Sequence, residues 1–333
     1  MEYNISSEYP ASGYNILYLL NMKRTTPTNS LKTLLLNMKR KRTKTNSLKF
    51  QYLPDDCWEL IFKNMRIDDE DYHSLSLVSK QFLSITNRLR FSLTIKDCQT
   101  IQEALNLVRR FPNLTSLHLC GQGGDLDELL RQISTLSINL TSLKLYDLRT
   151  MPANGLLDFS QNIKTLTEVT CSKTEYLRTT HMFLIADCFP NLQLLDLNHC
   201  EDISQKGIYR VLYRCRNIRH LNLADCSGVK LHRMMKFQVL KLEVLNLSNS
   251  TVDDRTLNVI TKSCTEILQL SLKFCDHVTY EGVKHVLQNC KQLREINLNG
   301  VKDDTILSNL ASMVLLRPSL RKITYGLGQC WVP

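Results

Sequence analysis

Hydrophobic residues recur along most of this chain in the pattern L-x-x-L-x-L, whose closing L-x-L alternates apolar and polar positions. Clear copies are NLTSLHL from Asn113 and NLQLLDL from Asn191, and an earlier copy, FSLTIKDC, begins at Phe91. From the copy that begins at Asn113 onward, the leading apolar residues of successive copies lie 24 to 27 residues apart. This regular spacing predicts an array of stacked repeats. These leading residues are Leu114, Leu140, Leu166, Leu192, Ile218, Leu242, Ile267, Leu293 and Leu320.

Each repeat is expected to contain one strand and one helix. The L-x-L alternation predicts a short strand with one face inward, and about 15 further residues have helical spacing, as Ile208, Val211 and Leu212 do after Ile203. One such unit cannot bury its own apolar face, so copies must stack. The sequence therefore predicts an α/β solenoid, a horseshoe of parallel strands and helices with nine to ten repeats, over residues 92–333.

A different pattern, without this repeat, precedes the array. Pro54 suits a first helical turn, and Asp55, Asp56 and Glu59 favour the positive end of a helix dipole. A polar loop at residues 67–71 is predicted to separate this helix from a second one. The apolar faces of the two predicted helices are Trp58, Ile61, Phe62 and Met65 for the first, and Leu75, Val78, Phe82, Ile85 and Leu89 for the second.

Composition indicates a folded protein with a basic tail. Of 333 residues, 43% are hydrophobic, and no segment has the 18 consecutive apolar residues that a membrane-spanning helix needs. Residues 1–50 hold nine Lys and Arg against two acidic residues, a net charge of +7, which leaves +3 of the total of +10 for the rest. Nucleic-acid binding is therefore not expected of the body, and any such role would fall to the tail.

The sequence predicts no catalytic site, no metal site and no cofactor. None of the 12 cysteines forms C-x-x-C, and without a secretory signal their even number does not indicate a disulfide framework. Phosphate-loop, dinucleotide and H-E-x-x-H motifs are absent from the sequence. The glycine cluster at residues 121–124 has no phosphate-binding signature after it, so it is interpreted as an irregular repeat loop.

The array resembles the cysteine-containing leucine-rich repeats, whose unit is similar to C-x-x-L-x-x-L-x-L-x-x-C-x-x-I/V-T-x-x-G. The copies led by Leu140, Leu166, Leu242 and Leu320 depart from this unit. The full match consists of Cys264, Ile267, Leu270, Leu272, Cys275, Val278, Thr279 and Gly282.

Residues 51–91 resemble the F-box, a helical motif that precedes substrate-reading domains. The likeness rests on Leu53-Pro54, Ile61-Phe62 and LSLVSKxF from Leu75, and it departs mildly at Ser79 and Phe82. With the repeats, the chain is similar to plant F-box/leucine-rich-repeat proteins. The resemblance implies docking to an Skp-family adaptor, and through it to a cullin, in a ubiquitin ligase. The implied adaptor-binding residues are Leu53, Pro54, Ile61, Leu75, Leu77, Val78 and Phe82.

Two alternatives stay open at this stage. The adaptor-binding residues could only pack the helices together, and the whole helical segment could be a cap for a free-standing repeat scaffold, because open solenoid ends need capping.

A horseshoe presents the polar residues that alternate with its inward leucines on its concave face. That face is mixed in charge and poor in aromatic residues, which favours a protein or peptide substrate over a hydrophobic ligand. The expected substrate-binding residues are His118, Lys144, Tyr146, Asp196, Asn198, His220, Asn222, Asn246, Gln269, Lys273, Glu295 and Asn297, and Ser116 lies on the same surface.

The tail, residues 1–50, is expected to be disordered, and it contains two similar words, LLNMKRTTPTNSLK and LLNMKRKRTKTNSLK. The second copy holds Met38, an alternative start. The basic run 39–42 resembles a nuclear-import signal, and the low acid content also permits a mitochondrial transit peptide. With a cytosolic or nuclear adaptor implied, the expected location is the cytoplasm, the nucleus or both.

Overall fold

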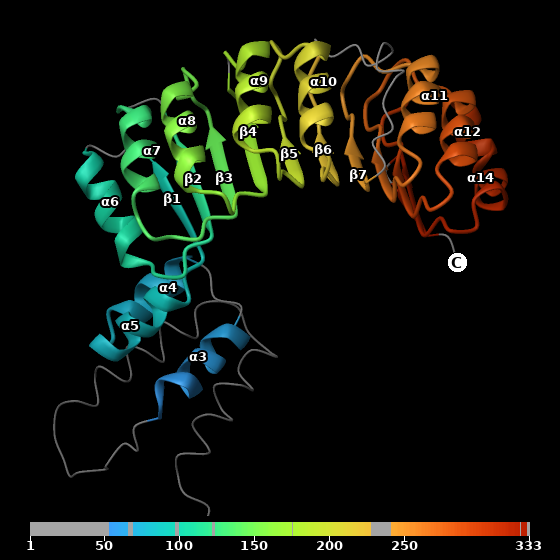
Figure 1. The fold of residues 1–333 in the computed structure, drawn as a ribbon. Helices are drawn as coiled ribbons and strands as arrows, with labels where there is room; N and C mark the ends of the chain where they lie inside the picture. The colour runs from blue at the N-terminus through green and yellow to red at the C-terminus, as the bar shows by residue number, and fades with distance from the viewer. Residues whose placement is uncertain are drawn as a thin grey trace, which may run out of the picture. The chain divides into compact units, whose positions relative to one another are not determined.

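The computed structural model describes residues 53–65, 69–96, 100–121, 124–174, 176–227, 241–326 and 328–331 (Figure 1). These residues form two compact units. The first contains the described residues up to Arg90 together with residues 111–113, and the second contains Phe91–Arg110 and the described residues from Leu114 onward. The predicted tail, with its basic run and Met38, lies outside the described residues.

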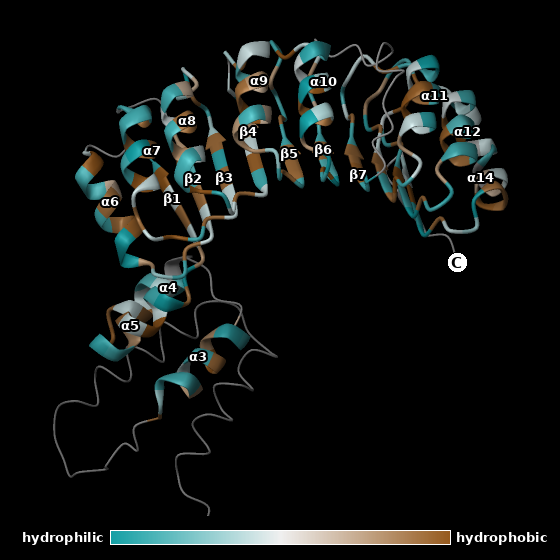
Figure 2. Ribbon diagram, in the orientation of Figure 1, coloured by the Kyte–Doolittle hydropathy of each residue, from teal (hydrophilic) through white to brown (hydrophobic). Residues whose placement is uncertain are grey.

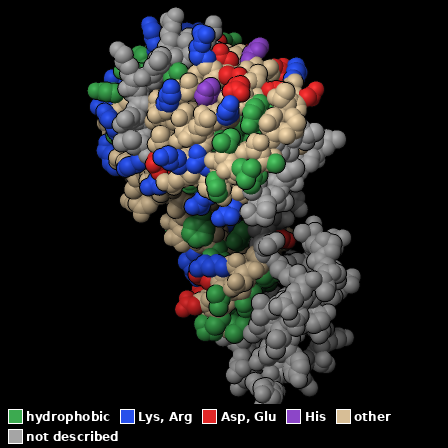
Figure 3. Space-filling view, turned by 90° about the vertical axis from the view of Figure 1, so that its right-hand side faces the viewer, with side chains coloured by type: hydrophobic (Ala, Val, Ile, Leu, Met, Phe, Trp, Pro, Cys, Tyr) green, Lys and Arg blue, Asp and Glu red, His purple; other side chains and the backbone are tan. Residues whose placement is uncertain are grey.

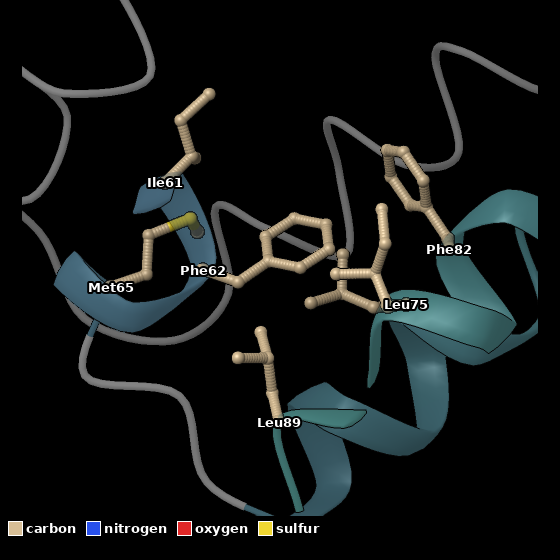
Figure 4. Close-up of a cluster of buried hydrophobic side chains, with 7 residues drawn as sticks. Ile61, Phe62, Met65, Leu75, Phe82 and Leu89 are labelled. Atoms are coloured by element: carbon tan, nitrogen blue, oxygen red, sulfur yellow. The ribbon is translucent and has the colours of Figure 1, made fainter. Parts of the chain in front are cut away.

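The first unit is a bundle of the helices α3 (Asp55–Asn64), α4 (Asp69–Ser76) and α5 (Lys80–Arg88). The second predicted helix is thus two helices, and α4 begins inside the predicted loop. The break has a local cause: the Ser79 side chain accepts a hydrogen bond from the Phe82 backbone N–H and caps α5. The hydrophobic spacing continues across the break because residues on both sides of it face the same core (Figure 4).

The second unit is built on one sheet of 11 described strands whose spatial order is their sequence order. Strands β1 to β10 pair in parallel, and β11 pairs with β10 in antiparallel fashion, a reversal that the repeat pattern did not predict. The strands are β1 (Ser92–Lys96), β2 (Ser116–Cys120), β3 (Ser142–Tyr146), β4 (Glu168–Ser172), β5 (Leu194–Asp196), β6 (His220–Asn222), β7 (Val244–Asn246), β8 (Gln269–Ser271), β9 (Glu295–Asn297), β10 (Lys322–Tyr325) and β11 (Gly328–Trp331).

Helices return the chain between strands and cover the outer side of this curved sheet (Figure 1). The return from β6 to β7 includes residues 228–240, which are outside the described residues. The described helices are α6 (Ile101–Arg110), α7 (Leu126–Ser134), α8 (Ala153–Asn162), α9 (Thr179–Cys188), α10 (Gln205–Arg214), α11 (Asp254–Ser263), α12 (Tyr280–Asn289), α13 (Thr305–Ser308) and α14 (Leu310–Leu316). The predicted solenoid of strand–helix repeats is confirmed.

The core of the solenoid lies between the strands and these helices. All nine leading apolar residues are buried, as are the inward strand residues such as Leu117 and Leu119 on β2. Figure 2 shows the corresponding hydrophobic colour along the strands and on the helix sides that face them. Glycines let neighbouring helices approach: a Cβ at Gly155 on α8 would lie 2.6 Å from the Asp127 Cα of α7.

Each of the strands β3 to β8 is followed within three residues by a non-glycine residue with left-handed backbone, φ between 50° and 58°. Their N–H groups donate to a carbonyl oxygen of the next repeat, as from His199 to Ala224 and from Asp225 to Ser248. These additional hydrogen bonds between repeats therefore offset the free-energy cost of the left-handed backbone. The six residues are Asp147, Lys173, His199, Asp225, Asn249 and Phe274.

The motif cysteines form a second set of links between repeats. The buried thiol of Cys226 donates to the Leu197 carbonyl at 3.1 Å, and that of Cys275 donates to the Leu247 carbonyl at 3.1 Å. Burial raises the pKa of Cys226 to about 12 and that of Cys200 to about 11. These thiols therefore stay protonated and act as small core groups with a weak donor.

Candidate functional site

The bundle core holds three of the residues that were predicted to contact an adaptor. Ile61, Leu75 and Phe82 are only 9%, 2% and 7% exposed. The Phe82 ring meets Trp58 edge-on at 4.7 Å and Phe62 edge-on at 5.1 Å between ring centroids. These buried side chains pack the helices of the bundle against one another (Figure 4). In this structure their position is therefore the one expected if they only pack the helices together.

The other predicted adaptor residues lie at or near the surface of the bundle. Pro54 and Leu77 are exposed, and Leu53 and Val78 are partly buried. Leu77 is 62% exposed because it lies in the turn between α4 and α5, where its N–H donates to the Ser74 carbonyl. Leu60 of α3, which the sequence pattern did not indicate as a contact residue, is 63% exposed. Figure 3 shows hydrophobic side chains in green on the surface of this helical unit.

Polar contacts hold α3 and α5 together. Arg88 donates to Asp55 at 2.9 Å and to Glu59 at 2.8 Å, while Gln81 donates to Asp55 at 2.9 Å. Hydrogen bonds from Gln81 and then from Arg88 lower the pKa of Asp55. The relative placement of the two helices is thus fixed by charged hydrogen bonds as well as by the aromatic core.

On the solenoid, the strand register aligns the outward-facing residues into three rows along the concave face. The first row runs Ser92, Ser116, Ser142, Glu168, Leu194, His220, Val244, Gln269, Glu295, Lys322. The second row runs Thr94, His118, Lys144, Thr170, Asp196, Asn222, Asn246, Ser271, Asn297, Thr324. The third row begins Lys96, Cys120, Tyr146, Ser172.

Four predicted substrate residues also have a structural role that the sequence analysis missed. A side-chain oxygen of Asp196, Asn222, Asn246 and Asn297 accepts a hydrogen bond, at 3.0 to 3.1 Å, from the backbone N–H two residues later. Such contacts end the strand in a turn. The recurrence of Asp or Asn at the last strand position of these four repeats is the sequence pattern that indicates this role.

Two other predicted residues, Asn198 and Lys273, lie beyond the ends of β5 and β8, and they continue the third row in the following turn. Within the described residues, the Asn198 Oδ1 atom is buried and has no hydrogen-bond partner. Gln269 donates to Glu295 at 3.3 Å across neighbouring strands. His220 lies in the first row and is exposed.

His118 has the densest polar surroundings of the concave face. Its Nε2 atom lies 3.3 Å from Ser92 Oγ and 3.0 Å from Ser116 Oγ, and its Nδ1 atom lies 3.3 Å from Thr94 Oγ1. The ring of Tyr146 meets His118 edge-on at 6.4 Å, and burial raises the pKa of Tyr146. Neither a group of three metal-ligating side chains nor a helix long and apolar enough to cross a membrane occurs in the described ranges.

The F-box domain family matches residues 50–94, which spans the helical bundle and confirms the predicted motif. Bundle and sheet together define the class of this protein: an F-box domain followed by a leucine-rich-repeat solenoid. The chain is homologous to two Arabidopsis thaliana proteins, with 25% identity over 239 residues to GRR1-like protein 1 and 25% over 226 residues to Coronatine-insensitive protein 1.

These alignments cover 68% and 62% of this chain but only 37% and 33% of the two relatives, so the chain spans about a third of their length. Among solved structures, a chain in the crystal structure of the Rad7 and Elc1 complex in yeast has a TM-score of 0.56 and 18% identity. The match covers 95% of this chain and 81% of that one, and it concerns the fold.

Proposed function

We propose that this protein is the substrate-recognition subunit of an SCF-type ubiquitin–protein ligase. In this proposal the F-box domain docks an Skp-family adaptor, and through it a cullin, while the solenoid binds a protein substrate. In this role the chain needs no catalytic group of its own. Binding the substrate close to the rest of the ligase lowers the barrier to reaction by proximity and orientation alone. The cytoplasm, the nucleus or both would be the place of action.

The observation that carries the proposal is the pair of leucines on the surface of a bundle with a filled core. Leu60 and Leu77 are more than half exposed. By contrast, Ile61, directly after Leu60, and Leu75, two residues before Leu77, are buried. Large exposed apolar side chains on a small domain indicate an interaction surface when they occur together with a matching docking family. We therefore assign adaptor docking to the exposed Leu60 and Leu77. The exposed Pro54 and the partly buried Leu53 and Val78 are the further contacts of this proposal.

The concave face supports the second half of the proposal. It presents two rows of mostly polar side chains that continue over ten parallel strands, with a third row on β1 to β4, and repeat arrays use such surfaces to bind other proteins. Homology to two Arabidopsis thaliana F-box/leucine-rich-repeat proteins is in line with this role.

The test is co-purification of the full chain with a purified Skp-family adaptor. Leu77→Asp should abolish capture and leave folding unchanged, because the side chain is 62% exposed. Leu157→Asp is the matched control, since Leu157 is 48% exposed on α8 of the solenoid. Failure of the folded unmodified chain to bind any Skp-family adaptor, or equal binding by both variants, would overturn the proposal and leave a repeat scaffold with a helical cap.

A further inference from the structure

Charge is unevenly distributed along the concave face. The row positions on β1, β2 and β3 include Lys96, His118 and Lys144, and they include no carboxylate. The next two strands reverse this sign, because Glu168 lies in the first row on β4 and Asp196 in the second row on β5. The face therefore has a basic third next to an acidic band.

These charges are not used to hold the fold together. No described residue forms an ion pair with Lys96, Lys144 or Glu168, and the Asp196 carboxylate only accepts the backbone N–H of Asn198. At the position of Asp196, neutral Asn222 and Asn246 make the same turn in the next repeats. The negative charge of Asp196 is therefore not needed for the turn, and it is available for a ligand.

Unsatisfied polar atoms accompany both charged regions. On β3, Ser142 is 5% exposed, and its Oγ atom is buried and has no hydrogen-bond partner within the described residues. Its row position lies next to Ser116 and close to His118. Beside Asp196, the buried Oδ1 atom of Asn198 likewise has no partner. A hydroxyl that can donate thus lies in the basic third, and an acceptor lies in the acidic band.

The spacing of the two regions matches a short peptide. Neighbouring strands lie about 4.8 Å apart, so Lys144 on β3 and Asp196 on β5 are separated by about 10 Å across the sheet. A peptide in the extended polyproline II conformation advances about 3.1 Å per residue with three residues per turn, so side chains three residues apart lie on the same side, about 9 Å from each other. Side chains about three residues apart would therefore reach one region each.

We propose that the concave face reads an extended segment of its protein substrate with an anionic side chain over β1 to β3 and a basic side chain about three residues away over β4 and β5. This inference rests on the proposed function and adds the chemistry of the substrate. Lys96 and Lys144 neutralise the anionic group, and the His118 ring and the serine and threonine hydroxyls around it can donate to it. Glu168, Asp196 and the side-chain Oδ1 atom of Asn198 bind the basic group.

The probes are short fluorescent peptides of glycine, serine and alanine that carry one lysine and one anionic residue, either phosphoserine or glutamate. The two residues are placed adjacent, three apart or six apart, in both orders. We expect the full chain to bind the peptides with the three-residue offset about tenfold more tightly than the others, as read by fluorescence polarisation. Tighter binding of phosphoserine than of glutamate would identify a phosphate group as the anion, and equal binding would identify a carboxylate.

Two substitutions assign the effect to this face. Lys144→Gln and Asp196→Asn should each weaken the best peptide about three- to tenfold, whereas Lys262→Gln on α11, exposed on the helical side, should not. Asp196→Asn keeps the turn that Asn222 makes in its own repeat. Absence of binding, or binding that ignores the offset or these two substitutions, would overturn the inference. Adaptor capture by the same preparations tests the proposed function separately, because it depends on the F-box domain.

Discussion

Phe82→Ala should unfold the F-box bundle. The ring of Phe82 lies at the centre of the bundle core, 4.7 Å from the Trp58 ring and 5.1 Å from the Phe62 ring between centroids. It joins α5 to α3, and it is only 7% exposed. Truncation to alanine removes both aromatic contacts and leaves a cavity between the two helices.

The loss is comparable to the stability of the whole bundle. Truncating a buried phenylalanine costs about 3–5 kcal/mol. Residues 53–89 make a domain of fewer than 40 residues, for which about 0.05–0.15 kcal/mol per residue gives a free energy of unfolding of roughly 2–6 kcal/mol. The substitution therefore removes most or all of it. By contrast, Leu77→Ala at the surface should cost less than about 0.5 kcal/mol.

The fluorescence of Trp58 reports on this change directly. The chain has two tryptophans, so a Trp331→Phe background leaves Trp58 as the only emitter. We expect Phe82→Ala to shift the Trp58 emission to the wavelength of a solvated indole without denaturant, while far-UV circular dichroism retains the signal of the solenoid. Leu77→Ala should keep the native emission.

An unshifted emission and an unchanged urea midpoint for Phe82→Ala would refute the reasoning. In that case Phe82 would not be a core residue of the bundle, and the prediction that it contacts the adaptor would regain support.

Two further predictions concern the solenoid. Gly155→Ala should lower the free energy of unfolding in urea by about 1–3 kcal/mol despite the better helix propensity of alanine, because its Cβ would lie 2.6 Å from the Asp127 Cα; the exposed Asn154→Ala next to it should not. Thiols whose pKa burial raises, such as Cys226 at about 12, should reduce stability as pH rises above about 9, since the unfolded chain releases the proton first. Each such thiol should lower the free energy of unfolding by about 1.4 kcal/mol per pH unit between its unfolded and folded pKa values. A urea midpoint that stays constant from pH 8 to 10.5 would contradict this prediction.

The strand–helix repeat was predictable because its cause is local and recurs. Each repeat needs the same inward residues, so Leu117 and its equivalents carry the pattern in every copy, and the register follows from it. The reversal of β11 was not predictable, because a single terminal strand has no second copy to reveal it.

The site was predictable as a surface but not residue by residue. Periodicity places Leu75, Val78 and Phe82 on one face of a helix, and it cannot tell a face that meets a partner from one that meets the other helices of the bundle. Leu77 is exposed because it lies in the turn between α4 and α5. Ser79 caps the start of α5 and so ends this turn. Asn222 and Asn246 look like contact residues by alternation, and only their hydrogen bonds to the following turn show the second role.

Adaptor docking by the F-box domain can be measured by hydrogen–deuterium exchange of the full chain, with and without a purified Skp-family adaptor. The account predicts that the adaptor slows exchange in α3, α4, α5 and the Leu77 turn between them, and that the concave strands β2 to β9 exchange at unchanged rates. Protection on those strands without protection of the helical bundle, or no protection anywhere with a folded chain, would contradict the assignment of adaptor docking to the F-box surface.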